Sequence, residues 1–177
     1  MSQEKSKMTD LKQQDFRVFN MFSRQWALAT AGNIDNFNTC TIGWGSLGTI
    51  WTRAAGDIVT IYVNPERYTS EFLLNNDYFT VSFFPEEYKE DLQYLGTHSG
   101  RDEDKVARTR LTPVKAGESV TFKEAELTFV CKKIYTHQFD KDQMDPEVYE
   151  TTYGYRNWVT HYEFIGKVVD VIDNREA

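Results

Sequence analysis

Short runs of β-branched and aromatic residues, each followed by turn-forming residues, recur along the chain from residue 26 onward. The first four are WALATAG (26–32), TCTIGWG (39–45), DIVTIYV (57–63) and DYFTVSFF (77–84). Two later segments, ELTFVCKKIYTHQF (126–139) and HYEFIGKVVDVI (161–172), alternate partly between apolar and polar positions. Runs of this kind predict strands, and partial alternation is typical of strands with one face in water. The pattern therefore predicts at least six strands.

Three segments between these runs predict short helices. RYTSEFLLNN (67–76) includes Thr69 as a candidate cap, and PEEYKEDLQYLG (85–96) opens with proline and acidic residues. EDKVARTRL (103–111) follows a candidate cap at Asp102. The sum is a mainly β fold with short helical excursions.

One domain is expected, because no internal repeat, low-complexity linker or shift in composition marks a second one. Residues 1–10 are polar and predict a disordered tail, which leaves 11–177 for the domain. A closed or split barrel suits such a domain best, because closing a sheet removes its exposed edges.

Composition and charge narrow the classes of function. The 177 residues carry a formal charge of -7, whereas nucleic-acid binders usually present a basic surface. No apolar run approaches the roughly 20 residues that span a bilayer, and the N-terminus does not resemble a signal peptide. Cys40 and Cys131 are too few for a disulfide scaffold. A cytoplasmic protein that binds neither nucleic acid nor membrane is expected.

Several common catalytic patterns are missing from the sequence. His98, His137 and His161 lack the spacing of a zinc motif, so no metal site is expected. The sequence also has no nucleophile elbow, no P-loop and no glycine-rich dinucleotide fingerprint. Cys40 is interpreted as a small buried thiol, because no histidine close in the sequence would activate it.

The segment NTCTIGWG (38–45), continuing as SLGTIW (46–51), is the first candidate binding element. Its glycines are unfavourable in a plain strand and often mark a bulge or the close approach of a ligand to the backbone. A flat aromatic ligand could lie here against backbone groups, with tryptophan supplying apolar area. The alternative is a bulged barrel strand whose tryptophans, Trp44 and Trp51, fill the core.

Two further segments could hold an anion. NPERYTSE (64–71) leads from a strand into a helix, so that Arg67, Thr69 and free backbone N–H groups meet. GTHSGRDEDK (96–105) offers turned-in amides and a lysine. The alternatives are an ordinary capped helix and a solvated connector, since residues 102–104 are acidic and would repel an anion unless they point outward or pair with Arg101.

Taken in order, these segments resemble the flavin reductase-like family with the FMN-binding split β-barrel, flavoredoxin among them. The resemblance rests on NTCTIGWG, NPERYT, DYFTVSFFPEEY and LGTHSGRDEDK, and it covers roughly residues 15–115. The closing strand HYEFIGKVVDVI matches more loosely. The resemblance implies a Greek-key split barrel, and typically a homodimer with the flavin near the subunit interface.

The resemblance also implies which residues hold FMN. The ring and the ribityl chain would lie along Cys40, Thr41, Ile42, Gly43, Trp44 and Gly45. The phosphate would be contacted by Arg67 and Thr69, with Ser99, Gly100 and Lys105 closing over it. His161 stands on the nicotinamide side, although Val159-Thr160 precede it where many members have Gly-Asp.

The implied function is that of an NAD(P)H-dependent flavin reductase, an enzyme that passes electrons from NAD(P)H through bound FMN to a flavin or another acceptor. No residue of the protein is assigned as catalytic, because the cofactor carries the chemistry. An alternative is a flavoredoxin-like electron carrier acting with a redox protein partner. A third is a barrel that has lost flavin and serves as an interaction module.

Overall fold

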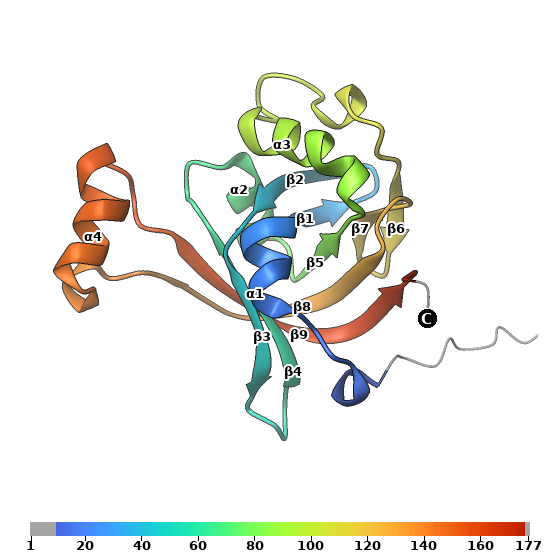
Figure 1. Cartoon of the computed structure of the whole chain (residues 1–177), viewed down its shortest axis with the longest axis horizontal. Coiled ribbons are helices and arrows are strands. Elements are labelled where there is room, and N and C mark those ends of the chain that lie inside the picture. Colours follow the sequence, from blue (N-terminus) through green and yellow to red (C-terminus); the bar gives the residue numbers. More distant parts are fainter. Residues whose placement is uncertain (1–9, 176–177) are drawn as a thin grey trace, which may run out of the picture.

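The computed structural model describes residues 10–175, so the expected tail at residues 1–10 lies, apart from Asp10, outside the described residues. Seven antiparallel strands form one sheet in the order β2-β1-β5-β8-β9-β4-β3, and β6 and β7 form a separate hairpin (Figure 1). The strands are β1 (Ala27–Asn33), β2 (Asn36–Ile42), β3 (Gly45–Ile50), β4 (Gly56–Val63), β5 (Tyr78–Phe83), β6 (Pro113–Ala116), β7 (Ser119–Phe122), β8 (Leu127–Gln138) and β9 (Tyr162–Asp173). The predicted mainly β fold is confirmed.

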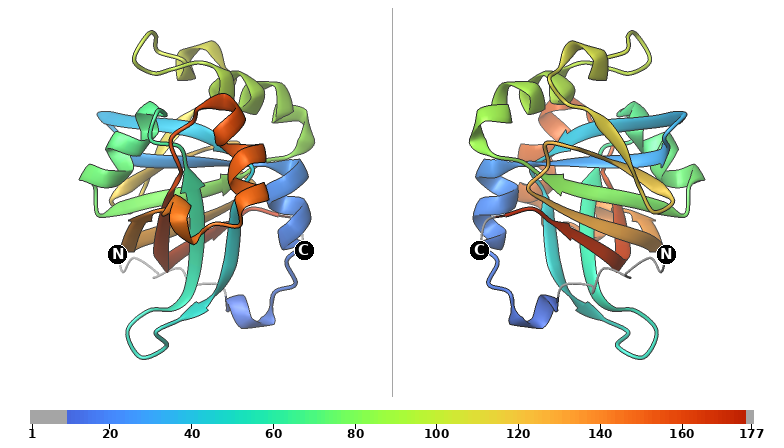
Figure 2. Two further views of the ribbon diagram at one scale, coloured as in Figure 1. Left: turned by 90° about the vertical axis from the view of Figure 1, so that its left-hand side faces the viewer. Right: turned by 90° about the vertical axis from the view of Figure 1, so that its right-hand side faces the viewer.

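The sheet curls round so that its two edges are joined by the chain itself. β2 and β3 are the edge strands, and only Gly43 and Trp44 separate them in the sequence. β2 also contacts β4, the neighbour of β3, and the two side views show the strands wrapping around a common interior (Figure 2). The glycine-rich segment predicted as one strand is therefore the end of β2, a turn, and the whole of β3.

The helices are α1 (Val18–Asn20), α2 (Tyr68–Asn75), α3 (Lys89–Thr97) and α4 (Pro146–Thr152). A π-helical turn (Met21–Gln25) follows α1, and short 3-10 turns occur at Leu11–Gln13, Glu86–Tyr88, Val106–Arg108, Lys141–Gln143 and Gly154–Arg156. α2 and α3 confirm two predicted helices. None of the helices within residues 10–175 is long and apolar enough to cross a membrane.

The third predicted helix, over residues 103–111, was wrong. Only the 3-10 turn at Val106–Arg108 forms there. The flanking side chains are engaged elsewhere: Lys105 is buried against carbonyls of α3 and the loop after it, and Arg110 forms an ion pair with Asp91. These tertiary contacts hold the segment in turns.

Thr69 does not cap α2 as expected. The position before the helix is Arg67, which makes no side-chain capping bond. The Thr69 hydroxyl instead donates to Asn38 Oδ1 on β2 at 3.1 Å. This hydrogen bond attaches α2 to the barrel and does not cap the helix.

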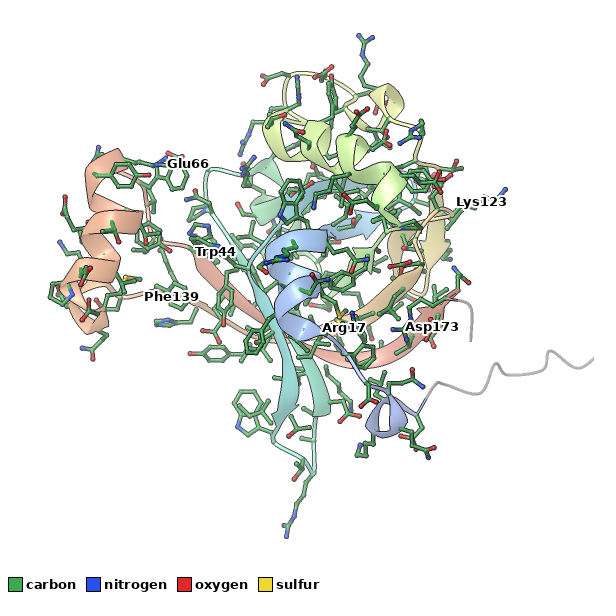
Figure 3. All side chains as sticks on the ribbon, viewed as in Figure 1. Arg17, Trp44, Glu66, Lys123, Phe139 and Asp173 are labelled. Carbon is green, nitrogen blue, oxygen red and sulfur yellow. The ribbon has the colours of Figure 1, made fainter. Side chains whose placement is uncertain are left out.

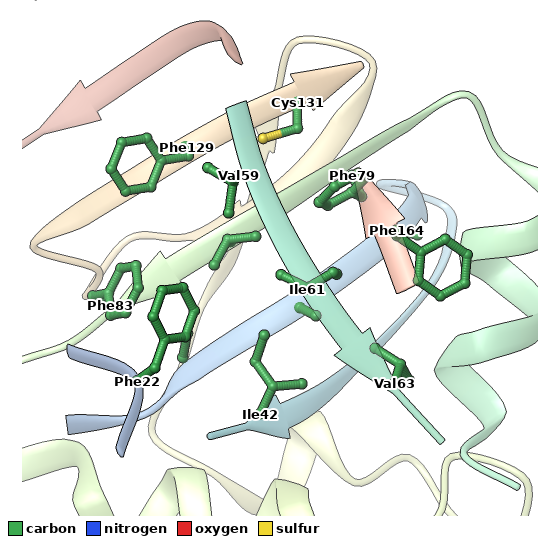
Figure 4. Close-up of a cluster of buried hydrophobic side chains, with 14 of the residues drawn as sticks. Phe22, Ile42, Val59, Ile61, Val63, Phe79, Phe83, Phe129, Cys131 and Phe164 are labelled. Atoms are coloured by element: carbon green, nitrogen blue, oxygen red, sulfur yellow. The ribbon is translucent and has the colours of Figure 1, made fainter. Parts of the chain in front are cut away.

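The interior of the barrel is filled by phenylalanine and branched aliphatic side chains from facing strands (Figure 4). Phe79, Phe83, Phe129 and Phe164 are all buried. A second buried cluster, which includes Phe84, Leu92 and Phe122, lies under α3 and the β6–β7 hairpin. Packing of this kind leaves little space for added atoms.

Gly166 on β9 is the tightest example in the core. A Cβ at this position would lie 2.5 Å from Phe79 Cζ and 2.6 Å from Cys131 Cβ. Gly166→Ala should therefore lower the free energy of unfolding by about 1–3 kcal/mol through overpacking. Gly48→Ala is the matched control, because nothing lies within 4 Å of the added Cβ there. Urea unfolding measures both variants, and equal losses would contradict this account of the core.

Candidate functional site

A cavity of about 370 Å³, here called the wide cavity, opens at the end of the barrel where β2 and β4 finish. Its walls come from Cys40–Trp44, from Tyr62–Asn64 with Glu66 and Arg67, and from Trp158 and His161 before β9. Trp44 and Glu66 lie on the side of the barrel that faces α4 (Figure 3). Residues distant in sequence thus meet in one hollow.

A second hollow of about 120 Å³, here called the small cavity, adjoins the first. It is lined by Tyr68 and Thr69 at the start of α2 and by Thr97–Gly100 with Lys105. Cys40, Glu66 and Arg67 line both hollows. The two form one elongated site with a broad part between β2 and β4 and a narrow polar part at the start of α2.

The site collects eleven of the twelve residues proposed from the sequence. The wide cavity includes Cys40, Thr41, Ile42, Gly43, Trp44, Arg67 and His161. The small cavity includes Thr69, Ser99, Gly100 and Lys105, together with Cys40 and Arg67 again. Gly45 lines neither: it is the first residue of β3, and a Cβ there would run into the ring of Phe22. Its glycine is accounted for by core packing.

β2 offers the site its backbone rather than its side chains. The Thr41 hydroxyl is turned away and donates to the Leu92 carbonyl of α3 at 2.5 Å. Cys40 and Ile42 are buried in the core. As an edge strand, β2 pairs only with β1, so every second backbone N–H and C=O points away from β1. A ligand lying along Cys40–Trp44 would meet these groups.

The tryptophans do not fill the core, so that alternative was wrong. Trp44 is 47% exposed at the rim of the wide cavity, and Trp51 is 51% exposed at the turn between β3 and β4. Trp158, which the sequence reasoning missed, also lines the wide cavity. Exposed indole faces beside a cavity suit the binding of a flat ligand.

Arg67 stands where the two cavities join. One of its terminal N–H groups donates to the Gly96 carbonyl near the end of α3, which draws the guanidinium across the site. Its other donors bond to no group within residues 10–175, so they are available to an anion, and arginine binds phosphate through paired hydrogen bonds. The side chain belongs to an exposed residue, so it can reach a ligand without moving the core.

Gly100 lets the loop after α3 approach β2. An added Cβ would collide with Asn38 Nδ2, while Asn38 Oδ1 accepts the Thr69 hydroxyl. Asn38 therefore links the two walls of the small cavity. The spacing between them depends on the absence of a side chain at residue 100.

Lys105 was expected to serve as a point charge for the same anion. Its ammonium is buried and donates to the carbonyls of Leu95 and His98, at 2.9 and 3.0 Å. Burial lowers the pKa of Lys105, and the nearby guanidinium of Arg67 acts in the same direction. An ammonium has three N–H donors, so one remains for the small cavity that this residue lines.

The acidic residues of the same loop turn outward. Asp102 and Asp104 are exposed, and Glu103 accepts the Tyr94 hydroxyl at 2.8 Å. Arg101 pairs with Glu71 rather than with these neighbours. The carboxylates of this loop therefore do not line the small cavity, where Glu66 is the acidic residue beside Arg67 and Lys105.

Cys40 is a buried thiol, as its sequence context indicated. Burial raises its pKa, and this outweighs the opposing influence of Thr69, Lys105 and Arg67. The thiol thus stays protonated at neutral pH and packs in the core behind the cavities.

His161 sits below Trp44, with 4.7 Å between the ring centroids. Its Nδ1 lies 2.9 Å from the hydroxyl oxygen of Tyr153, which comes just after α4. Burial, assisted by the positive charge of Arg67, lowers the pKa of His161 to about 4. The imidazole is therefore neutral at physiological pH. Tyr153 carries no local sequence signal for this contact, which only the tertiary fold creates.

A known protein family and several solved structures are similar to this chain. A family model described as the flavin reductase like domain matches residues 19–177. No curated protein sequence matches the chain.

Solved structures share the fold at low sequence identity. An FMN-binding protein from Thermus thermophilus is 21% identical with a TM-score of 0.63, covering 84% of this chain and 70% of that one. Flavoredoxin from Methanosarcina acetivorans is 21% identical at 0.63, with 84% and 68% covered. A putative flavin reductase with a split barrel domain from Shewanella frigidimarina is 17% identical at 0.64, with 91% and 74% covered. The chain thus has the split-barrel fold.

The low pKa of His161 predicts how stability depends on pH. The folded chain resists protonation until about pH 4, whereas an unfolded histidine titrates near 6.5. The stability contributed by the neutral ring is complete above about pH 6.5 and is lost as the pH falls toward 4. The free energy of unfolding should therefore fall more steeply over this range in the wild type than in His161→Gln.

Urea unfolding at several pH values measures this difference. His137→Gln replaces an exposed histidine and should keep the wild-type pH dependence. Parallel curves for the wild type and His161→Gln would contradict a buried neutral imidazole.

Proposed function

Because the chain belongs to the flavin reductase-like domain family, we propose that it binds FMN in the wide and small cavities and passes electrons through it. The observation that carries this proposal is that the two cavities adjoin and share Cys40, Glu66 and Arg67 as lining residues. A broad hollow along the unpaired edge of β2 lies next to a narrow hollow that Arg67 and Lys105 line. FMN has the same two parts, a flat ring and a phosphate.

The residues of the wide cavity fit a flat ring system. The edge of β2 supplies N–H and C=O groups for the polar rim of the ring. Trp44 and Trp158 can cover a face that would otherwise meet water. A cavity of about 370 Å³ lies within the usual range for small-molecule sites.

The residues of the small cavity fit a phosphate. Arg67 and the third N–H of Lys105 supply positive charge, and the turn at Ser99 and Gly100 supplies backbone amides. Thr69 lies in the first turn of α2, where backbone N–H groups have no partner within the helix. The phosphate would anchor FMN at this end and set the position of the ring.

Bound FMN would supply the redox chemistry, while the protein supplies position and electrostatics. The β2 backbone would orient the ring, and Trp44 with Trp158 would limit the access of water. His161 would remain neutral beside the ring and offer hydrogen bonding without a charge. On this proposal NAD(P)H is the electron donor, and a flavin or another small molecule is the acceptor.

A structural relative supports the proposal that the electron acceptor is a small molecule. The FMN-binding protein from Thermus thermophilus has been crystallised with bound cyclohexenone and with bound p-hydroxybenzaldehyde. Both are small conjugated carbonyl compounds. A molecule of that size could enter the wide cavity of this chain beside His161.

A second candidate is an electron carrier that exchanges electrons with a redox protein. Flavoredoxins from Methanosarcina acetivorans and Desulfovibrio vulgaris share the fold. Val159 and Thr160 stand before His161 in place of the family's usual Gly-Asp. The wide cavity also exposes Trp44 and Trp158, and the neighbouring Val159 is exposed as well, which gives an apolar surface that a protein could cover.

The proposal also covers the oligomeric state and the cellular location of the protein. Residues 139–161, here called the α4 arm, join β8 to β9 and project away from the barrel (Figure 1). An apolar groove of about 590 Å³ runs between this arm and Trp44, lined in part by Phe139, Met144 and Val148. We propose that residues 11–177 act as one domain in a cytoplasmic homodimer, whose second copy covers this face.

Arg67→Ala should weaken FMN binding by about 1.5–3 kcal/mol, because it removes a charge-assisted contact to the phosphate. Fluorescence titration of the apoprotein with FMN measures the affinity. Arg53→Ala removes the same charge from the exposed turn between β3 and β4 and should leave the affinity unchanged. Equal affinity in all three proteins would refute the phosphate role, and a colourless wild type that takes up no FMN would refute the proposed function.

The rate of NAD(P)H oxidation separates the two candidate functions. With FMN present, a reductase should consume NADH or NADPH rapidly over many turnovers, as followed by the nicotinamide absorbance. A carrier should bind FMN tightly yet oxidise either nucleotide slowly, while chemically reduced protein passes electrons to a redox protein.

A further inference from the structure

The hydroxyl of Tyr153 makes two contacts with a single residue, His161. It lies 2.9 Å from the ring nitrogen Nδ1, and it accepts a long hydrogen bond of 3.5 Å from the backbone N–H of the same histidine. Both residues are buried. The pair connects the α4 arm to the wall of the wide cavity.

These contacts determine where the imidazole proton sits. A tyrosine hydroxyl has one hydrogen to donate, and a buried hydroxyl normally donates it. Within residues 10–175, Tyr153 Oη has no hydrogen-bond partner other than His161. The backbone N–H can only donate to Oη, so the hydroxyl hydrogen is directed at Nδ1. Nδ1 then acts as the acceptor, and a neutral ring carries its proton on Nε2.

Nε2 faces the wide cavity. Among the described residues no side chain or backbone group bonds to it, and no buried side-chain nitrogen is left without a partner. Nε2 is therefore accessible on the cavity side, since His161 lines that cavity.

The groups around the ring favour its neutral form. Trp44 covers it from the turn between β2 and β3, and Tyr153 holds it from the α4 arm. Arg67 acts on it electrostatically from the loop between β4 and α2, and its positive charge opposes protonation. The exposed Glu66 lines the same cavity.

We propose that Tyr153 is a positioning residue that holds His161 with its proton on Nε2, so that the wide cavity presents a fixed hydrogen-bond donor to the carbonyl oxygen of a planar ligand. A neutral imidazole N–H donates a hydrogen bond but does not give up its proton readily. His161 thus orients the electron donor or acceptor beside the flavin and does not act as an acid. The ligand role rests on the proposed function, whereas the tautomer does not.

The tautomer is measured directly by ¹⁵N NMR of the full chain without flavin at neutral pH. In the wild type, His161 Nδ1 should show the shift of an unprotonated ring nitrogen and Nε2 that of a protonated one. Tyr153→Phe keeps the ring and removes the hydroxyl, so the two tautomers should become mixed. Tyr155→Phe is the matched control, because Tyr155 is 59% exposed, and it should give the wild-type spectrum.

Two results would overturn the positioning role. One is a wild-type spectrum with the proton on Nδ1. The other is a Tyr153→Phe spectrum identical to the wild type. The wild-type measurement decides the tautomer even if the variant does not fold, and it needs no bound FMN.

The donor role is tested on the FMN-loaded protein with p-hydroxybenzaldehyde as the probe, followed by the flavin absorbance. His161→Leu should weaken binding by about threefold to tenfold, as expected for one lost hydrogen bond. His161→Gln keeps an N–H donor and should recover most of the affinity. Equal affinity in the wild type and His161→Leu would refute the donor role, whereas failure to load FMN would count against the proposed function alone.

Discussion

The unpaired edge of β2 is the constraint on which the rest of the site depends. A strand at the edge of a sheet has backbone N–H and C=O groups that need partners other than a neighbouring strand. In this chain α2 and α3 both contact β2 from outside the sheet. Side-chain bonds fix them there, from Thr41 to the Leu92 carbonyl and from Thr69 to Asn38. The two cavities lie at the end of this strand, along Cys40–Trp44.

Charge is concentrated at the site against the trend of the whole chain. The protein carries a net charge of -7, yet Arg67 and Lys105 meet at the small cavity, where Glu66 is the one acid among the described lining residues. The burial of Lys105 is tolerated because its ammonium bonds to carbonyls at the end of α3, the negative end of a helix dipole. Lys105 therefore caps the C-terminal end of α3 and also contributes to the positive potential of the site.

The sequence patterns predicted the strands and helices that interactions between residues close in the chain determine. Six strands and the helices α2 and α3 follow from apolar runs and turn residues, and the three candidate binding segments meet at the two cavities. β3 was not separated from β2, because the turn at Gly43 and Trp44 reads as part of one strand. α4 has a clear signal in Asp145 and Pro146, and the Asp145 carboxylate accepts from the N–H groups of Glu147 and Val148, but this signal was overlooked.

The errors have a common physical origin in contacts between residues far apart in the chain. The helix expected over 103–111 is prevented by the tertiary bonds of Lys105 and Arg110. Gly45 lines neither cavity, and its packing against Phe22 could likewise not be inferred from the sequence. Tyr153 cannot be paired with His161 from spacing alone, since the intervening loop could take many paths. The two halves of the site therefore differ in origin. One wall of the small cavity follows β4 directly and the other follows α3, whereas the surroundings of His161 also depend on Tyr153 and so on the path of the α4 arm. Changes in that arm can therefore alter the environment of His161 while the small cavity remains.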